Sequence, residues 1–288
     1  MESDGVLVVP GPPGIHLCNP FKCLTKQPEF LPDTTLYVLG SFGALANPSS
    51  FHHPDIRFIR KYVYDRVTPQ LRQIFPGKKI ELLFDRVSVR KAGTTVPGEK
   101  WHRDICESKP DGDIILGGWV NLDPDDIQEF SCVPGTHTDP FDAKGFCPIK
   151  DPEEYKQKKV IYKIKPGEVI LFHQNIVHEI KSKKYKKDSH KLYIGWRITE
   201  RSEPLFDHTK VIEEQGIPYI PSGQLPPIYA KLHMVNHKHK VIDFSKTVRP
   251  ELLDTSGLVK RYVPSLKDMG LPLWPAYTPE DLAILRPS

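Results

Sequence analysis

The sequence has few cysteines and no long apolar run, and each shortage excludes a class of protein. The five cysteines are scattered and include no CxxC pair: Cys18, Cys23, Cys106, Cys132 and Cys147. An odd, dispersed set argues against a disulfide framework or a zinc ribbon, and a reducing compartment is the simplest interpretation. No stretch approaches the roughly 18 apolar residues of a membrane helix. The acidic start, MESDGVLVVPGPPG, has too short an apolar run for a signal peptide. We therefore expect a soluble intracellular protein, most simply a cytoplasmic one.

A strong net charge is also lacking. The formal net charge is +4 and the isoelectric point is about 8.6, values that permit an anionic ligand without demanding nucleic acid. We expect a small-molecule substrate, which could be anionic, and the oligomeric state stays open. What the chain does have is 29 prolines and 19 glycines, which favour a β-rich fold with many turns over a helix bundle.

The regions outside the predicted core are rich in proline. Residues 1–79 are expected to form an irregular arm (1–35) followed by one amphipathic helix (53–75), capped by Asp55 and broken near Pro69. Residues 200–288 are expected to wrap around the core and to close with a short helix capped by Thr278. The whole chain, 1–288, is thus interpreted as a single domain.

Between about residues 80 and 199 the pattern changes to short strands separated by turn residues. Strands are predicted at 79–91, 113–122, 158–164, 167–173, 175–180 and 191–199. Many short strands at this spacing predict a mainly β fold with flanking helices and a double-stranded β-helix, or jelly-roll, core.

One His-x-Asp pair stands out as a candidate metal site. His102 and Asp104, in WHRD, are two residues apart, which puts both side chains on the same face of an extended strand. Two other such pairs have poorer contexts: His53 opens a helix, and His137 lies in a proline-flanked loop. Only His102 enters an apolar setting.

A third ligand could come from GEVILFHQNIVHEI, which offers His173 and His178. The two are five residues apart, so in a straight strand they face opposite sides. The local pattern alone leaves the choice open.

The last predicted strand places two cations on one face. Lys191, Tyr193, Gly195 and Arg197 alternate with apolar residues, and cations in a β-rich core need an anionic partner. A bound dicarboxylate would be one such partner, and an ordinary salt bridge is the alternative, more so for Lys191 than for Arg197.

These residues together resemble the phytanoyl-CoA dioxygenase-like branch of the Fe(II)/2-oxoglutarate oxygenases. The similar elements follow one another in the family's order: WHRD, IILGGWVNLDPDD, SCVPGTH and KPGEVILFHQNIVHEI. The resemblance implies an enzyme in which His102, Asp104 and His178 bind Fe(II), and it leaves His173 as a bystander. It also implies that Trp119 lies beside the cosubstrate 2-oxoglutarate.

The resemblance further implies a dioxygenase that hydroxylates a C–H bond, with Thr136 and His137 structural in the PGTH turn. The sequence departs from the family where an arginine usually holds the far carboxylate of 2-oxoglutarate. That stretch is the basic loop KSKKYKKDSH, so either Lys191 replaces the arginine or Arg197 does this work.

Two other functions remain possible from the sequence. The chain could be a catalytically inactive jelly-roll protein with a structural or binding role, since proline-rich arms at both ends suit wrapping a partner. It could also be a cupin-type metalloprotein without a cosubstrate, although it lacks a glycine-framed HxH cluster. The lysines at 181–187 could bind an anionic substrate, but a solvated loop is the simpler interpretation. The segment HMVNHKHK (233–240) looks metal-binding but is expected to be exposed.

Overall fold

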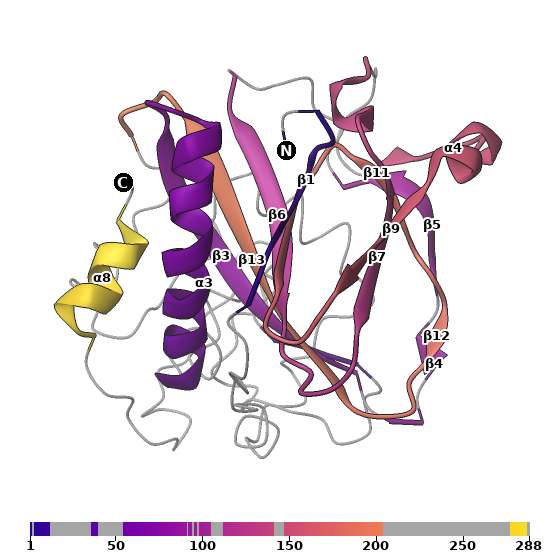
Figure 1. Cartoon of the computed structure of the whole chain (residues 1–288), viewed down its shortest axis with the longest axis horizontal. Coiled ribbons are helices and arrows are strands. Elements are labelled where there is room, and N and C mark those ends of the chain that lie inside the picture. Colours follow the sequence, from indigo (N-terminus) through magenta and orange to yellow (C-terminus); the bar gives the residue numbers. More distant parts are fainter. Residues whose placement is uncertain are drawn as a thin grey trace, which may run out of the picture.

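Two antiparallel sheets form the centre of the molecule (Figure 1). The structure is a computed structural model that describes residues 1, 3–11, 36–39, 54–90, 92–93, 95–96, 98–104, 112–140, 147–203 and 277–286. One sheet has six strands and the other has five, and a two-stranded ribbon lies beside them.

The strand order does not follow the sequence, so many sheet neighbours are joined by crossing connections. The six-stranded sheet runs β1 (Val6–Val9), β10 (Val169–His173), β6 (Ile114–Asn121), β13 (Ser189–Thr199), β3 (Lys79–Arg90), β2 (Leu36–Leu39). The five-stranded sheet runs β8 (Cys147–Pro148), β5 (Glu99–Arg103), β11 (Val177–Ile180), β7 (Gln128–Val133), β9 (Val160–Ile164). The ribbon pairs β12 (Lys183–Lys184) with β4 (Thr95–Val96), and two short helices, η1 (Thr136–Thr138) and α4 (Glu153–Lys158), lie in connections. This arrangement is a jelly roll, so the predicted fold class is confirmed.

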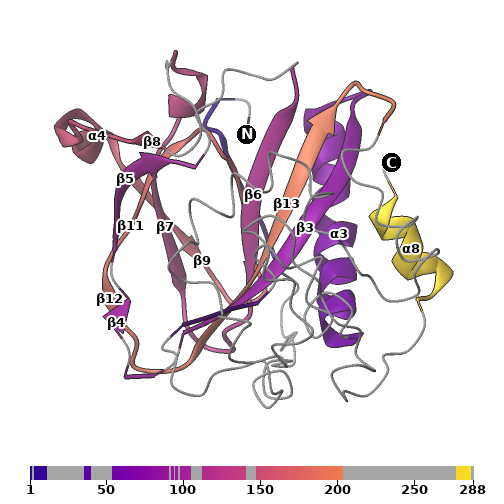
Figure 2. The same ribbon diagram turned by 180° about the vertical axis from the view of Figure 1, so that it is seen from behind.

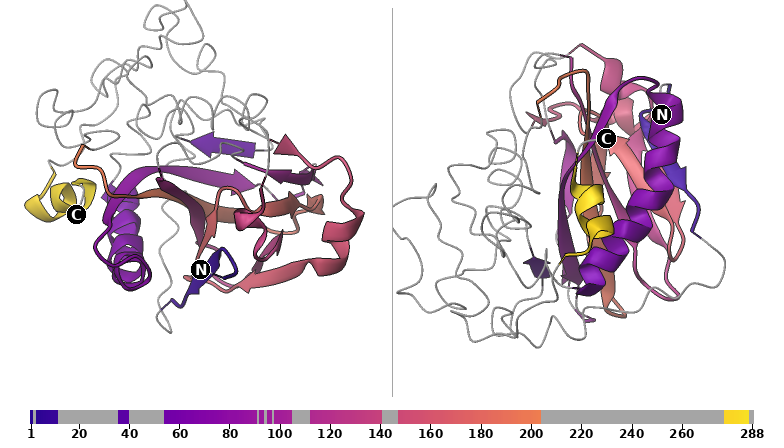
Figure 3. Two further views of the ribbon diagram at one scale, coloured as in Figure 1. Left: turned by 90° about the horizontal axis from the view of Figure 1, so that it is seen from above. Right: turned by 90° about the vertical axis from the view of Figure 1, so that its left-hand side faces the viewer.

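Helix α3 (Pro54–Ile74) lies along the six-stranded sheet (Figures 1 and 2). Its apolar side chains share one core with residues of β3, β6, β10 and β13. Helix α8 (Pro279–Leu285) lies next to α3 (Figure 3), and Arg57 of α3 contacts Asp281 of α8 at 3.4 Å. The helices therefore cover the outer face of this sheet.

Strand β13 shows how sequence alternation separates the two faces. Leu192, Ile194 and Trp196 join the core under α3. Tyr193 packs instead on the second core, which lies between the two sheets and includes Trp119. The face predicted for Lys191 and its alternate neighbours is thus the one turned toward the interior of the barrel.

The prediction of an irregular N-terminal arm is wrong at residues 6–9. Strand β1 pairs with β10, with Val6 opposite Phe172 and Val9 opposite Val169. The first and last residues of β1, Val6 and Val9, are buried. An isolated four-residue segment could not bury its side chains in this way without a partner strand. The run VLVV is too short to be distinguished from loop by periodicity alone.

The predicted break of the first helix is also wrong, because α3 continues through Pro69. Pro69 is exposed, so water can satisfy the carbonyl that its missing N–H leaves unpaired. The helix begins at Pro54, which puts Asp55 inside the first turn rather than at the cap.

The terminal helix is confirmed. The Thr278 hydroxyl accepts a hydrogen bond from the backbone N–H of Asp281, and the Asp281 carboxylate accepts one from the backbone N–H of Thr278, which is a capping box. The tail that precedes it, 204–276, includes HMVNHKHK and lies outside the described residues, so its wrapping role stays a prediction.

Among the described helices, none is long and apolar enough to cross a membrane. Of the two cysteines in the described residues, Cys132 is a free, buried thiol and Cys147 is disulfide-bonded.

Candidate metal centre

Two histidines face each other across neighbouring strands. Strands β5 and β11 are antiparallel, and His178 lies directly opposite His102 in the ladder. Side chains at opposite positions share a face of the sheet, and here the two imidazole rings lie 4.2 Å apart, centroid to centroid. Both residues are buried, with His102 1% and His178 4% exposed.

Asp104 completes the cluster from the end of β5. Its backbone N–H donates to the carbonyl of Gln174 at 3.1 Å, which ties the residue to the turn between β10 and β11. Its Oδ1 lies 3.4 Å from His102 Nε2 and 3.6 Å from His178 Nε2. One ligand atom from each of the three residues lies within 4.8 Å of the other two.

The orientation of both rings is set by backbone carbonyls. His102 Nδ1 lies 2.6 Å from the carbonyl oxygen of Lys100, and His178 Nδ1 lies 3.0 Å from that of Ile176. Because a carbonyl can only accept, each Nδ1 carries the proton and each Nε2 keeps its lone pair for a metal. Two imidazoles and a carboxylate on one side of a site suit iron(II) and leave other positions open, so the residues fit this ion.

The two histidines differ in basicity. Burial lowers the pKa of His178, which favours the neutral, metal-binding form. Burial also acts against protonation of His102, but the hydrogen bond and negative charge of Asp104 outweigh it and raise the pKa of that imidazole. The carboxylate is therefore placed to balance positive charge at this site.

Aromatic side chains line one side of the cluster of His102, Asp104 and His178, the side toward the interior of the barrel. The rings of Phe130 and Phe172 each lie 5.5 Å from that of His178, and both contact Trp119, at 5.6 and 6.1 Å. This lining keeps the inner side of the cluster apolar.

His173 lies away from the cluster, in contact with His137 at a ring distance of 4.5 Å. The turn at 174–176 gives the change of direction that separates the two histidines of this segment. Thr136 has a structural contact, since its hydroxyl accepts from the backbone N–H of Val177 at 2.9 Å.

The other two His-x-Asp pairs are not part of this cluster among the described residues. Asp139 is 3.3 Å from Arg103, and His53 lies outside the described residues.

The two candidate cations of β13 have different surroundings. Arg197 contacts Glu81 at 3.0 Å and Asp113 at 2.6 Å and is 2% exposed. The Nζ of Lys191 lies 4.2 Å from the ring centroid of Trp119. Within the described part of the chain it has no ion pair or hydrogen bond, and burial lowers its pKa.

Sequence reasoning missed two residues near these groups. Glu99 Oε2 lies 3.8 Å from His102 Nε2, and its spacing of three from the histidine predicts no shared strand face. An extra residue in β5, where Glu99 and His102 pair with Ile180 and His178, shifts the register and makes this approach possible. Gln128 accepts a hydrogen bond from Trp119 Nε1 at 2.9 Å, a contact between strands of different sheets for which the sequence carries no signal.

Comparison with solved structures finds matches at low sequence identity and with TM-scores below 0.5. The epimerase SnoN of nogalamycin biosynthesis is 13% identical, with 68% of this chain and 77% of that chain covered and a TM-score of 0.48. HygX of Streptomyces hygroscopicus, solved with nickel and 2-oxoglutarate, is 17% identical, with 68% and 83% covered and a TM-score of 0.47. EctD of S. alaskensis is 17% identical, with 67% and 72% covered and a TM-score of 0.43. A search of curated proteins found no match.

The family model described as phytanoyl-CoA dioxygenase (PhyH) matches residues 2–182. The match begins earlier than the motifs quoted from the sequence and ends before β13, the strand that carries Lys191. Because it spans more than half of the chain, the predicted family is confirmed: the chain belongs to the phytanoyl-CoA dioxygenase family and is an oxygenase of the iron- and 2-oxoglutarate-dependent class.

Proposed function

We propose that the protein hydroxylates a C–H bond of a small molecule, with Fe(II) held by His102, Asp104 and His178. The observation that carries the proposal is the convergence of these three ligand atoms within 4.8 Å in a chain of this family. When bound together, Fe(II), 2-oxoglutarate and O2 supply the oxidising chemistry of the reaction.

The chain's own residues prepare this site before any ligand arrives. The carbonyl oxygens of Lys100 and Ile176 hold the two imidazoles with Nε2 toward Asp104. Phe172 and Phe130 exclude water from the inner side. Fixed ligands need little reorganisation on binding the metal.

Lys191 is our candidate for holding the far carboxylate of 2-oxoglutarate. Lys191 is half-buried, and its ammonium stands over Trp119 without a carboxylate partner among the described residues; a cation partly shielded from water is stabilised by one. Arg197 is the weaker candidate, because Glu81 and Asp113 already neutralise its guanidinium.

An anionic substrate is supported by the lysines that follow β11. Lys183 and Lys187 contact Asp126 and Asp125, at 3.9 and 2.5 Å. Three others are exposed: Lys181, Lys184 and Lys186. Solvated lysines of this kind attract anions over a Debye length and do not identify one.

The first test is anaerobic titration of the purified apoprotein with Fe(II) and 2-oxoglutarate, followed by the weak visible metal-to-ligand charge-transfer band. We expect the band in the wild type, its loss in His178→Ala and its survival in the matched control His173→Ala, because His178 lies 3.6 Å from Asp104 whereas His173 contacts His137.

Survival of the band in His178→Ala, or its loss in His173→Ala alone, would contradict the assignment of His178 as the ligand. No band in the wild type, under conditions where Fe(II) is shown to bind, would overturn the cosubstrate and favour the inactive jelly-roll alternative.

The cytoplasmic location remains our proposal for the compartment, and the state of Cys147 weighs against it. Disulfides are rare in cytosolic proteins, whereas Cys147 is disulfide-bonded. Mass spectrometry after alkylation of protein from its native source would show whether Cys147 is oxidised, which argues against the cytoplasm, or reduced, which agrees with it.

A further inference from the structure

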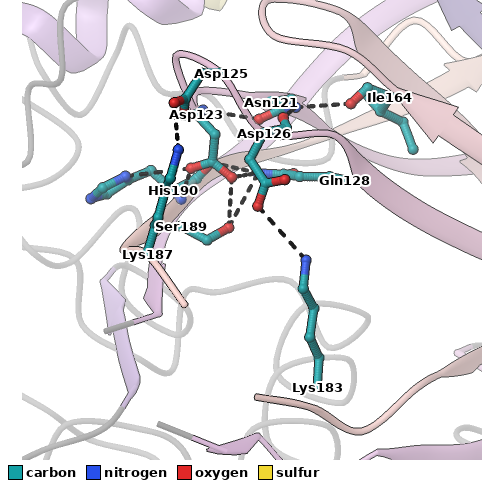
Figure 4. A network of polar contacts seen from close by, with 10 residues as sticks. All are labelled: Asn121, Asp123, Asp125, Asp126, Gln128, Ile164, Lys183, Lys187, Ser189 and His190. Carbon is teal, nitrogen blue, oxygen red and sulfur yellow. Dashed lines mark hydrogen bonds and ion pairs between the residues drawn. The ribbon is translucent and has the colours of Figure 1, made fainter. Parts of the chain in front are cut away.

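Gln128 belongs to a polar network that joins β7 to β13 through Asp123 (Figure 4). It is 4% exposed. Its Oε1 accepts from Trp119 Nε1 at 2.9 Å, and its Nε2 donates to Asp123 Oδ2 at 2.8 Å and to the carbonyl of His190 at 2.9 Å. An indole N–H can only donate and a carboxylate can only accept, so the amide has a single possible orientation.

Asp123 is the fixed anion behind this amide. Besides Gln128, it accepts from the hydroxyl of Ser189 at 2.7 Å and from the backbone N–H of His190 at 2.6 Å. The turn that carries it is held by Asn121, whose side chain accepts from the Asp123 backbone at 2.9 Å and donates to the carbonyl of Ile164 at 2.8 Å. A carboxylate with this many donors is a rigid attachment point.

The network reaches Lys191 by two routes. The first is through the backbone, because Asp123 and Gln128 bind the N–H and the carbonyl of His190, the residue before Lys191. The second is through Trp119, whose ring lies 4.2 Å from the Lys191 ammonium and whose N–H is held by Gln128. The Gln128 amide therefore helps to hold both the backbone next to Lys191 and the Trp119 ring that lies under the Lys191 ammonium.

We propose that Gln128 is a positioning residue that fixes Trp119 and Lys191 so that the ammonium meets the far carboxylate of a 2-oxo dicarboxylic acid. The proposal rests on the proposed function, in which Lys191 holds that carboxylate. It assigns to Gln128 the discrimination between dicarboxylic and monocarboxylic 2-oxo acids, because a flexible lysine that is not held in place loses part of its interaction energy to ordering.

The test compares two ligands that differ only at the far end. The dissociation constants of 2-oxoglutarate and of 2-oxopentanoate, which lacks the far carboxylate, are measured anaerobically with Fe(II) by the charge-transfer band. We expect Gln128→Met to weaken 2-oxoglutarate binding about tenfold, the scale of one or two buried hydrogen bonds, with 2-oxopentanoate unchanged. Lys191→Met should remove the preference for the dicarboxylate.

Two further variants separate positioning from general destabilisation. Tyr62→Phe removes one buried hydrogen bond, to the carbonyl of Gly167 at 3.0 Å, on the helix side of the sheet, and should leave both constants unchanged. Trp119→Phe removes the donor to Gln128 but keeps an aromatic ring, so it should weaken 2-oxoglutarate selectively even if Gln128→Met does not fold.

The outcomes are distinguishable. Equal weakening of both acids, or wild-type selectivity in Gln128→Met or Trp119→Phe, would overturn the positioning role while leaving Lys191 in place. Unchanged selectivity in Lys191→Met, or no preference for 2-oxoglutarate in the wild type, would overturn the role of Lys191 and the positioning role with it.

Discussion

Gly117 on β6 shows how closely side chains pack beside the candidate metal centre. A Cβ at this position would lie 2.1 Å from Gln174 Nε2 and 3.3 Å from Phe172 Cζ. Gln174 itself is buried, and its Oε1 has no hydrogen-bond partner among the described residues. The amide therefore occupies the space that a side chain at 117 would need.

We expect Gly117→Ala to destabilise the fold by about 1–3 kcal/mol, the usual cost of overpacking, by displacing the Gln174 amide. The double variant with Gln174→Ala should recover most of this loss, because the truncated side chain vacates the space. Urea unfolding of the two single variants and the double variant measures the coupling.

Gly118→Ala is the matched control at the next position. Its Cβ would lie 2.1 Å from the backbone oxygen of Ile170, which no side-chain truncation can relieve. Gln174→Ala should leave its loss of stability unchanged, and equal rescue of both glycine variants would contradict the packing explanation.

At the scale of elements, helix α3 carries a local cost that its packing offsets. Pro69 lies inside the helix, where proline removes a hydrogen bond and crowds the preceding turn. The buried face of Ile59, Val63 and Val67 against the sheet keeps the helix continuous.

Replacing this proline should stabilise the protein. We expect Pro69→Ala to raise the free energy of unfolding by about 1–2 kcal/mol, because the gain in helix propensity exceeds the loss of rigidity in the unfolded chain. Gln70→Ala, at the neighbouring exposed position, should change it by less than about 0.5 kcal/mol. A fall in the urea midpoint of Pro69→Ala would show that the fold requires proline here.

At the scale of the whole molecule, Asp123 joins the β6–β7 turn to β13. Burial acts against its ionisation, but the interactions with His190, Gln128 and Ser189 outweigh it and lower the pKa of Asp123. A carboxyl with a lowered folded-state pKa contributes stability above its unfolded pKa of about 3.9, and this contribution is lost as the pH falls through the folded-state value.

The loss of folding stability at low pH should therefore depend on the carboxyl group of Asp123. We expect the unfolding free energy of the wild type to fall more steeply below about pH 4 than that of Asp123→Asn, which is less stable throughout. Asp125→Asn, which changes an exposed carboxylate paired with Lys187, should keep the wild-type slope. Parallel curves for the wild type and Asp123→Asn in urea unfolding between pH 3 and pH 7 would contradict this role.

The sequence alone determined the fold class, six of the thirteen described strands, the capped terminal helix and the family. These rest on local patterns: alternation along β13, the Thr278 cap, and the order of WHRD, PGTH and the distal histidine. A period of two also placed Lys191 and Tyr193 on one face. Such features survive in the sequence because each depends on residues close together in the chain.

Only the tertiary structure distinguished the two histidines and the two cations by their surroundings. His178 lies opposite His102 because β11 pairs with β5, and Arg197 is neutralised because Glu81 on β3 and Asp113 before β6 lie beside it. The pairing of β1 with β10 and the link from Gln128 to Trp119 likewise join distant segments. Contacts of this kind depend on which strands become neighbours, and strand order in a jelly roll is set by packing of the whole chain, which no local pattern records.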